Sequence, residues 1–321
     1  MAALLSVVTG SYNEEGNVDE WFERVLVSVA GIADLDVEVI WVDNASQDGT
    51  VAKVKAWCAK DARIRLIVNA RNFGPIRSPF HGVMQAKGDA VVYLASDLQD
   101  PPELLSEFVQ AWRDGAHVVA GVYKKTEDAW SMSIARKTFY AVMRAVSEAE
   151  AIKAFTGFGL YSRKVVELLR QTGGPMPYVR GLVAEFGLPW KSIPYDKPQR
   201  KHGVSKNNLL GLIDQAILGL TTMSRAPIRF ATLLGMGMSC LGFSLALGYL
   251  VSKLVFWDSF PMGQAPLLIG IFLFASVQIL IVGLIGEYVA AMHLRMQNKP
   301  WVIEFERVNF PLCDGQNEIL K

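Results

Sequence analysis

Three clusters of polar side chains, each placed just after an apolar run, carry the residue types best suited to chemistry. They comprise Tyr12, Asn13, Glu14 and Glu15 in "GSYNEEGN", Asp43 in "WVDNASQDGT", and Asp97, Gln99 and Asp100 in "ASDLQDPP". Carboxylates gathered at one place repel one another unless a cation or a hydrogen-bonding ligand joins them. A hard divalent cation, held by one or two carboxylates and by substrate phosphates, would remove this repulsion. A single aspartate of this kind is also explained as a helix N-cap or turn residue, so the coincidence of three clusters is what favours a site.

The segments between these clusters alternate in a way that would bring the clusters together. Five short apolar runs are typical of buried strands: "LLSVVTGS", "DVEVIWVD", "IRLIVNA", "DAVVYLAS" and "AHVVAGVY". Helix-like segments separate them, with Ser46 or Asp48 as a candidate N-cap and Gly115 suited to a helix C-terminus. The alternation predicts an α/β fold with a doubly wound, mostly parallel sheet, whose ligands bind at the carboxyl ends of the strands.

Composition limits the class of partner. The chain has 321 residues and a net charge of +1, which argues against the broad basic surface of a nucleic-acid-binding protein. Cys58, Cys240 and Cys313 are far apart and lack metal-ligand spacing, so we expect reduced thiols. The N-terminal "MAALLSVVTGSYNEE" lacks the charged region and cleavage site of a signal peptide.

Two long uncharged runs, residues 230–252 and 259–286, predict a two-helix transmembrane hairpin. We place the hairpin at 229–292, with spans at about 230–256 and 265–290. Basic residues flank its outer ends: Arg225, Arg229, His293, Arg295 and Lys299. The turn between the two spans, residues 257–264, has Asp258 as its only charged residue. The positive-inside rule therefore puts both termini in the cytoplasm. The alternative is a pair of buried helices in a soluble core.

Six motifs, in order, resemble the family-2 glycosyltransferases of GT-A fold: "SVVTGSYNEE", "VDNASQDGT", "NARNFG", "SDLQDPPELL", "YVRGLV" and "HGVSK". With the two spans, they are similar to polyisoprenyl-phosphate glycosyltransferases, including dolichyl-phosphate mannose synthases and bacterial undecaprenyl-phosphate glucosyltransferases. The similarity runs from about Leu4 to Lys299. It implies a cytoplasmic GT-A domain (1–204), an interfacial amphipathic helix (205–228), the hairpin and a cytoplasmic tail (293–321). Ordinary packing against the sheet is the alternative for the amphipathic helix.

The resemblance also implies roles for individual residues. The donor nucleotide would contact Tyr12, Asn13, Glu14, Asp43, Asn44, Arg71, Asn72, Ser96 and Asp97. A divalent cation, Mg²⁺ or Mn²⁺, would bind Asp97 and Gln99, and the acceptor phosphate would bind Arg200, Ser205 and Lys206. The candidate catalytic residues are Asp97, Arg180, Arg200 and Lys206. The alternative for the basic residues is a charge that faces solvent or lipid headgroups.

The chain departs from the family pattern at several of these motifs. Relatives usually carry Asp-x-Asp where this chain has Ala95-Ser96-Asp97, and often Asp-Phe-Arg where it has Gly157-Phe158-Gly159. Many carry Asp in place of Asn44. These departures remove one carboxylate from the expected metal site and leave the sugar donor open.

The resemblance implies an inverting transfer of a hexose from a nucleotide sugar to a polyprenyl phosphate at the bacterial cytoplasmic membrane, for cell-envelope or O-antigen modification. UDP-glucose is the first expected donor, with UDP-galactose and UDP-N-acetylglucosamine as alternatives. We expect a homo-oligomer, with a tetramer as one form, and a small membrane flippase as a further partner. The competing readings are a weakened family member that acts as a membrane scaffold and a processive polysaccharide synthase, which would need more spans and a Gln-x-x-Arg-Trp motif.

Overall fold

The computed structural model describes most of the predicted catalytic domain and the second predicted span. The described residues are 2–124, 155–172, 182–183, 185–196, 198, 233–238, 240–241, 244, 247–248, 251, 254–255, 264–296, 300 and 302–310. The chain divides into two compact units. The described residues up to 198 and from 300 onward belong to the first unit, and those between 233 and 296 belong to the second.

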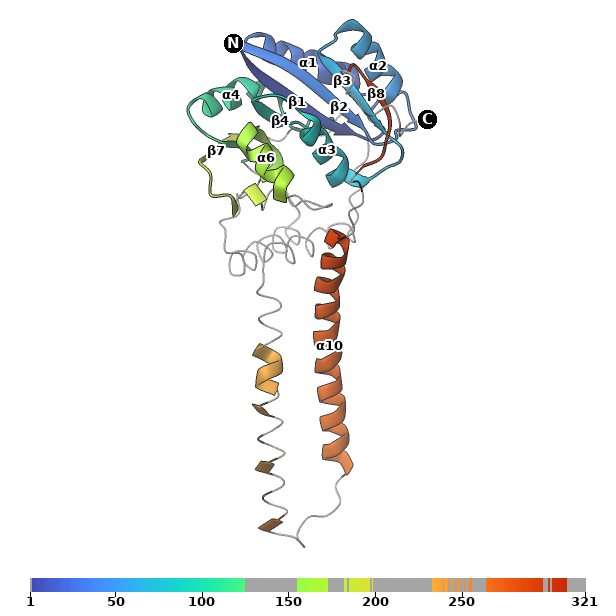
Figure 1. Ribbon diagram of the computed structural model, residues 1–321, viewed down its shortest axis with the longest axis vertical. Helices are drawn as coiled ribbons and strands as arrows, with labels where there is room; N and C mark the ends of the chain where they lie inside the picture. Colours follow the sequence, from blue (N-terminus) through green and yellow to red (C-terminus); the bar gives the residue numbers. More distant parts are fainter. Residues whose placement is uncertain are drawn as a thin grey trace. The chain divides into compact units, whose positions relative to one another are not determined.

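Eight strands of the described chain form one sheet in the order β7-β5-β6-β4-β1-β2-β3-β8 (Figure 1). Their bounds are β1 Ala3–Ser11, β2 Leu35–Asp43, β3 Ile64–Asn69, β4 Ala90–Tyr93, β5 Val118–Tyr123, β6 Phe155–Ser162, β7 Trp190–Tyr195 and β8 Glu304–Val308. β1 pairs in parallel with β2 and β4, β2 with β3, and β5 with β7. β6 and β8 run antiparallel to their neighbours. The predicted mostly parallel α/β sheet is therefore confirmed.

Helices cover both faces of the sheet (Figure 1). One core cluster joins the sheet to α1 Val18–Ala30, α2 Thr50–Lys60 and α4 Leu105–Arg113, which follows the short 3-10 turn η1 Pro102–Leu104. The other cluster joins it to α3 Gly74–Gln85 and α6 Arg163–Thr172. On the first face the rings of Trp21, Phe22 and Trp41 lie 5.1–5.2 Å apart, centroid to centroid. Such aromatic clusters bury large apolar areas and anchor the helix to the sheet.

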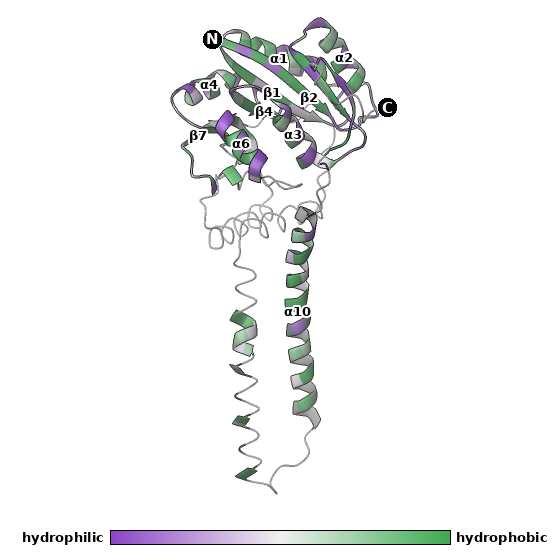
Figure 2. Cartoon of the chain, in the orientation of Figure 1, coloured by the Kyte–Doolittle hydropathy of each residue, from purple (hydrophilic) through white to green (hydrophobic). Residues whose placement is uncertain are grey.

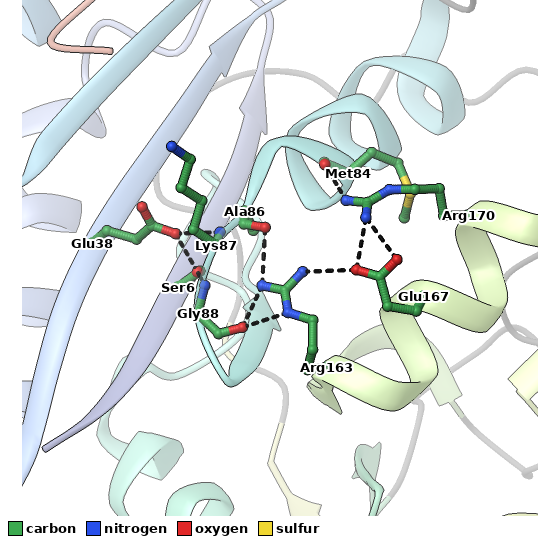
Figure 3. A network of polar contacts seen from close by, with 9 residues as sticks. All are labelled: Ser6, Glu38, Met84, Ala86, Lys87, Gly88, Arg163, Glu167 and Arg170. Atoms are coloured by element: carbon green, nitrogen blue, oxygen red, sulfur yellow. Dashed lines mark hydrogen bonds and ion pairs between the residues drawn. The ribbon is translucent and has the colours of Figure 1, made fainter. Parts of the chain in front are cut away.

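A polar network holds the turn between α3 and β4 (Figure 3). The buried carboxylate of Glu38 accepts hydrogen bonds from Ser6 Oγ at 2.5 Å and from the backbone N–H of Lys87 at 2.7 Å. From α6, Arg163 donates to Gly88 O at 2.9 Å and to Ala86 O at 3.0 Å. These bonds satisfy backbone groups that would otherwise be buried without partners, and they tie the end of α3 to both the sheet and α6.

The C-terminal tail expected at 293–321 is not separate from the catalytic domain. Residues Glu304–Val308 form β8, the edge strand beside β3. The Glu304 carboxylate contacts His81 Nε2 of α3 at 2.5 Å and also binds the Arg307 guanidinium, which donates to Gln85 Oε1 at 3.0 Å. The sequence did not reveal this strand because its partners lie more than 200 residues away.

The second unit contains α10, which runs from Gln264 to Met296 and includes the whole of the second expected span. Figure 2 colours most of α10 as hydrophobic. Large apolar side chains are exposed along the helix: Leu267, Ile271, Phe274, Ile279, Val282, Ile285, Val289 and Met292. Within the described part of the chain, no helix meets the length and apolarity required to cross a membrane. Most of the first expected span and the whole expected interfacial helix, 205–228, lie outside the described residues.

We expect Glu304→Gln to weaken the attachment of β8 in a pH-dependent way. Burial alone would raise the pKa of Glu304, but hydrogen bonds from His81 and Arg307 outweigh it and lower the pKa from 4.5 to about 2. A carboxylate whose folded pKa is depressed contributes stability that is present above its unfolded pKa and lost as the pH falls through the folded value. The wild-type free energy of unfolding should therefore drop between about pH 5 and pH 2 by up to roughly 3 kcal/mol more than that of the variant.

Denaturant unfolding across this pH range measures the effect. Glu306→Gln is the matched control, because Glu306 lies on the same strand and its ion pair with Lys55 is more than one-third exposed. Exposed pairs contribute about 0–1 kcal/mol. An equally steep acid-dependent loss in wild type and Glu304→Gln would contradict this account.

Candidate functional site

The ends of β1 and β2 are joined through the side chains of Asp43 and Ser46. Asp43 Oδ2 accepts from the Ser46 backbone N–H at 2.8 Å, and its Oδ1 accepts from Ser46 Oγ at 2.5 Å. Ser46 Oγ in turn accepts from the backbone N–H of Asn13 at 2.8 Å, and Asn13 Oδ1 accepts from Gln47 N at the same distance. The two loops therefore hold each other in one shape. Asn13 has a positive φ of 58°, a conformation that asparagine tolerates better than most residues.

Glu14 and Asp43 are buried at this edge, although both belong to the predicted nucleotide site. Asp43 has no exposed surface and Glu14 is 8% exposed. Burial raises the pKa of Asp43, against the opposing effect of the hydrogen bonds from Ser46 and Ser11. Glu14 Oε2 accepts from Asn17 Nδ2 at 2.6 Å. The predicted role of these residues in binding a nucleotide stays a prediction, while their role in shaping the edge is visible.

A cluster of asparagines lies beside this edge, between the ends of β2 and β3 and the start of α3. Asn44 accepts from Asn69 Nδ2 at 3.1 Å and from the Phe73 backbone N–H at 2.8 Å. It donates to Asn72 Oδ1 at 2.8 Å and to Gly74 O at 3.2 Å. Arg71, also predicted to lie near the nucleotide, is exposed, and its guanidinium lies 4.2 Å from the centre of the Phe73 ring.

The loop after β4 places the third cluster against β1. Ser96 is buried, and its Oγ donates to Gly10 O at 3.1 Å. Asp97 Oδ1 accepts from the Gln99 backbone N–H at 3.2 Å, and Leu98 between them has a φ of 57°. Asp100 is tied down by the hydroxyl of Tyr195, which donates to it at 2.7 Å. Since β1 lies between β2 and β4, all three clusters meet at one edge, as the sequence predicted.

Asp97 and Gln99 fit a metal site only in part. They offer a carboxylate and an amide oxygen, which are ligands that hard divalent cations prefer. Within the described chain, no group of three His, Cys, Asp or Glu residues could hold a metal ion. A cation at Asp97 would therefore need further oxygen ligands, as substrate phosphates supply in many Mg²⁺ sites. Ala95 stands where the motif Asp-x-Asp has its first carboxylate. The Ala95 carbonyl oxygen accepts a hydrogen bond from Trp21 Nε1 at 3.1 Å.

The missing Asp-Phe-Arg motif has a structural explanation in β6. Gly157 has a φ of 106°, a conformation in which an aspartate would be strained. A Cβ atom at Gly159 would lie 2.4 Å from the carbonyl oxygen of Val119 on the neighbouring strand, so an arginine could not fit there. Phe158 between them is buried in the core. The loss of the acid and the arginine is thus built into the strand.

Arg180, Arg200, Ser205 and Lys206, the predicted phosphate-binding residues, lie outside the described residues. Conversely, three residues that organise the edge were not predicted to do so. Ser46 was considered only as an N-cap, although its position three residues after Asp43 is typical of an aspartate-capped turn. Tyr195 carried no local signal and Asn69 was noted only as the first residue of "NARNFG", because their partners are distant in sequence.

The comparisons with known proteins agree with this fold. The model of the family "Glycosyl transferase family 2" matches residues 6–169, which span β1 to most of α6. The chain belongs to glycosyl transferase family 2. It is 31% identical over 300 residues to the uncharacterized glycosyltransferase YkcC of Bacillus subtilis, covering 93% of this chain and 92% of YkcC. The protein is therefore a glycosyltransferase with a GT-A fold.

Two further relatives extend the comparison along the chain. An SfII prophage-derived bactoprenol glucosyl transferase of Shigella flexneri is 27% identical, over 92% of this chain and 96% of its own. Among solved structures, the mannosyltransferase PcManGT from Pyrobaculum calidifontis, in complex with GDP-Man and Mn²⁺, matches with a TM-score of 0.50. That match has 19% identity and covers 94% of this chain and 89% of PcManGT, so it supports the fold alone.

We expect Ser46→Ala to destabilise the glycosyltransferase domain by about 1–3 kcal/mol, because it removes one hydrogen bond to the buried Asp43 carboxylate and takes away the acceptor of the Asn13 N–H. Urea unfolding measures the change. Ser28→Ala in α1 is the control, since Ser28 Oγ donates only to Arg24 O in its own helix. If both serine variants unfolded at the same urea concentration, Ser46 would not be the link between the two loops.

Proposed function

We propose that this glycosyltransferase moves a hexose, with UDP-glucose as the first donor to test, to a polyprenyl phosphate at the cytoplasmic face of a bacterial membrane. The observation that carries the proposal is the similarity to the bactoprenol glucosyl transferase of Shigella flexneri, which extends over 92% of this chain. It therefore includes the apolar C-terminal part as well as the sheet. The shared edge of Asp43, Ser96 and Asp97 is where ligands bind in open α/β sheets.

A membrane hairpin is part of the proposal. It is supported by the uncharged runs 230–252 and 259–286 and by the exposed apolar side chains of α10. A polyprenyl chain stays in the bilayer while a nucleotide sugar stays in water, so the enzyme must work at the interface. Self-association, with a tetramer as one form, and a small membrane flippase complete the proposed set of partners. A wash-resistant membrane fraction that needs detergent for release would support the hairpin, and a freely soluble chain would refute it.

The chemistry of the acceptor suits a site whose strand carries Gly157 in place of an acid. A phosphate monoester is ionised at neutral pH, because its second pKa is about 6. It can attack the anomeric carbon without a general base, whereas a sugar hydroxyl needs one. A single displacement then inverts the configuration at that carbon. What the protein must supply is orientation of the two reactants and stabilisation of the departing diphosphate.

A divalent cation, Mg²⁺ or Mn²⁺, would neutralise charge on that diphosphate, with Asp97 and Gln99 as its protein ligands. We expect Asp97→Asn to lower transfer by about 10²–10³-fold, since it removes the charged oxygen ligand. Donor affinity in the variant should no longer respond to added Mg²⁺ or Mn²⁺. Asp36→Asn, an exposed residue at the opposite end of β2, is the control. A cation response in Asp97→Asn equal to that of wild type would exclude this metal site.

The basic motif "QRKHGVSK" is proposed to receive the acceptor phosphate through Arg200, Ser205 and Lys206. Replacing both Arg200 and Lys206 with Ala should abolish transfer to lipid while donor binding stays within a few-fold of wild type. The reason is that both basic side chains would contact the acceptor phosphate and not the donor. Lys164→Ala, on the exposed surface of α6, controls for loss of positive charge. An equal loss of donor binding would instead assign these residues, together with Arg180, to the donor diphosphate.

The decisive experiment incubates membranes that contain the protein with labelled nucleotide sugars and undecaprenyl phosphate. The extracted lipid is then analysed by mass spectrometry across UDP-glucose, UDP-galactose and UDP-N-acetylglucosamine. The proposal predicts one labelled polyprenyl-phosphate hexose, and the donor that yields this product identifies the sugar. No labelled lipid with any donor would overturn it and favour the scaffold reading.

A further inference from the structure

The loop that runs from the end of β3 to the start of α3, residues 69–74, is held mainly by one side chain. The side chain of Asn44, the residue after β2, makes four hydrogen bonds, and all of them go to this loop. Two of the partners are backbone groups, the N–H of Phe73 at 2.8 Å and the carbonyl oxygen of Gly74 at 3.2 Å. The other two are the side chains of Asn69 and Asn72.

The backbone partners fix which way the Asn44 amide points. A backbone N–H can only donate, so Phe73 must meet the amide oxygen, and a carbonyl can only accept, so Gly74 must meet the nitrogen. The amide has two hydrogens to donate and two lone pairs to accept with, and all four are in use. Asn44 is also 5% exposed. No hydrogen-bonding capacity remains on this side chain for a nucleotide.

The helix that follows the loop is held by other contacts. At its C-terminal end, Arg170 donates to Met84 O at 2.8 Å and Arg163 donates to Ala86 O at 3.0 Å (Figure 3). In its middle, His81 contacts Glu304 of β8 at 2.5 Å. The start of the loop keeps the bonds from Ala70 N–H to Ile303 O and from Asn69 Nδ2 to Ser78 Oγ, both at 2.9 Å. Loss of the Asn44 bonds would therefore loosen the rest of the loop, around Arg71 to Gly74, and leave α3 in place.

We propose that Asn44 is a positioning residue, which holds residues 69–74 in the shape that receives the donor nucleotide, rather than a residue that contacts the nucleotide. This inference rests on the proposed function, because it takes the loop with Arg71 and Asn72 to lie beside the donor. It also gives a reason for asparagine, rather than aspartate, at position 44. A carboxylate can accept from Phe73 and Asn69, but it cannot donate to Asn72 Oδ1 and Gly74 O, and its charge would face both oxygens.

Limited trypsin digestion of the full-length protein tests the loop without using any donor. Arg71 is an exposed cleavage site inside the loop, and Lys87 is an exposed site in the turn held by Glu38 and Arg163. We expect Asn44→Ala to raise the ratio of cleavage after Arg71 to cleavage after Lys87 by about tenfold, as loss of a buried hydrogen-bonded group allows. Asn44→Asp, which keeps the accepted bonds, should raise the ratio less and should recover as the pH is lowered, because a protonated carboxyl regains a donor.

Asn309→Asp is the matched control for loss of two donated bonds. Asn309 Nδ2 donates to Cys58 O and Ile64 O, both at 2.8 Å, away from the loop. This variant should leave the Arg71 to Lys87 ratio at its wild-type value. A wild-type ratio in Asn44→Ala, or in Asn44→Asp at neutral pH, would overturn the proposal, and so would a tenfold rise in the ratio for Asn309→Asp.

Donor binding completes the test. The same Asn44 variants should weaken UDP-sugar affinity in the order of their cleavage ratios, with Asn44→Ala about tenfold weaker than wild type. A loosened loop with unchanged donor affinity would overturn the positioning role. If the wild-type protein bound no nucleotide sugar at all, the proposed function would fail, and the cleavage ratios would still decide whether Asn44 braces the loop.

Discussion

The buried side chains of Asp43 and Asn44 at the carboxyl edge of the sheet need hydrogen-bond partners, and the architecture of the site follows from this constraint. Asp43 ends β2 and Asn44 follows it, each with at most 5% of its surface exposed. A buried polar group left unpaired costs about 1–3 kcal/mol. Neighbouring loops therefore supply hydrogen-bond partners to the side-chain polar atoms of these two residues. One wraps around Asp43 through Ser46, and the other around Asn44 through Phe73 and Gly74. The edge is thereby ordered before a ligand arrives, which lowers the entropic cost of binding.

The backbone of β6 has no place for the acid and the arginine of the Asp-Phe-Arg motif. Gly157 adopts a conformation that disfavours an aspartate, and Gly159 has no room for a side chain. A transferase built on this strand is best matched to an acceptor that arrives already ionised, as a phosphate monoester does. The proposed lipid phosphate thus agrees with the strand as well as with the relatives.

The last described strand ties the end of the chain to the part that would bind the donor. β8 comes after α10 in the sequence, yet it pairs with β3 and its Glu304 contacts α3. The backbone N–H of Ala70, at the start of the loop braced by Asn44, donates to Ile303 O at 2.9 Å. The described residues from Val302 onward, which follow α10, therefore belong to the sheet domain, and Ile303 lies against the donor loop.

The sequence by itself determined β1 to β5, the helices between them and the polar residues that follow β1, β2 and β4, because period, capping and turn preferences depend on neighbouring residues. It placed Asp43, Ser96 and Asp97 at one edge correctly, since parallel strands end on the same side. Tertiary structure alone decided which polar groups pair. The four bonds of Asn44, the bond from Tyr195 to Asp100 and the contact of His81 with Glu304 join residues 25 to 223 positions apart. Such pairings depend on how distant segments meet in space, and no local pattern records that.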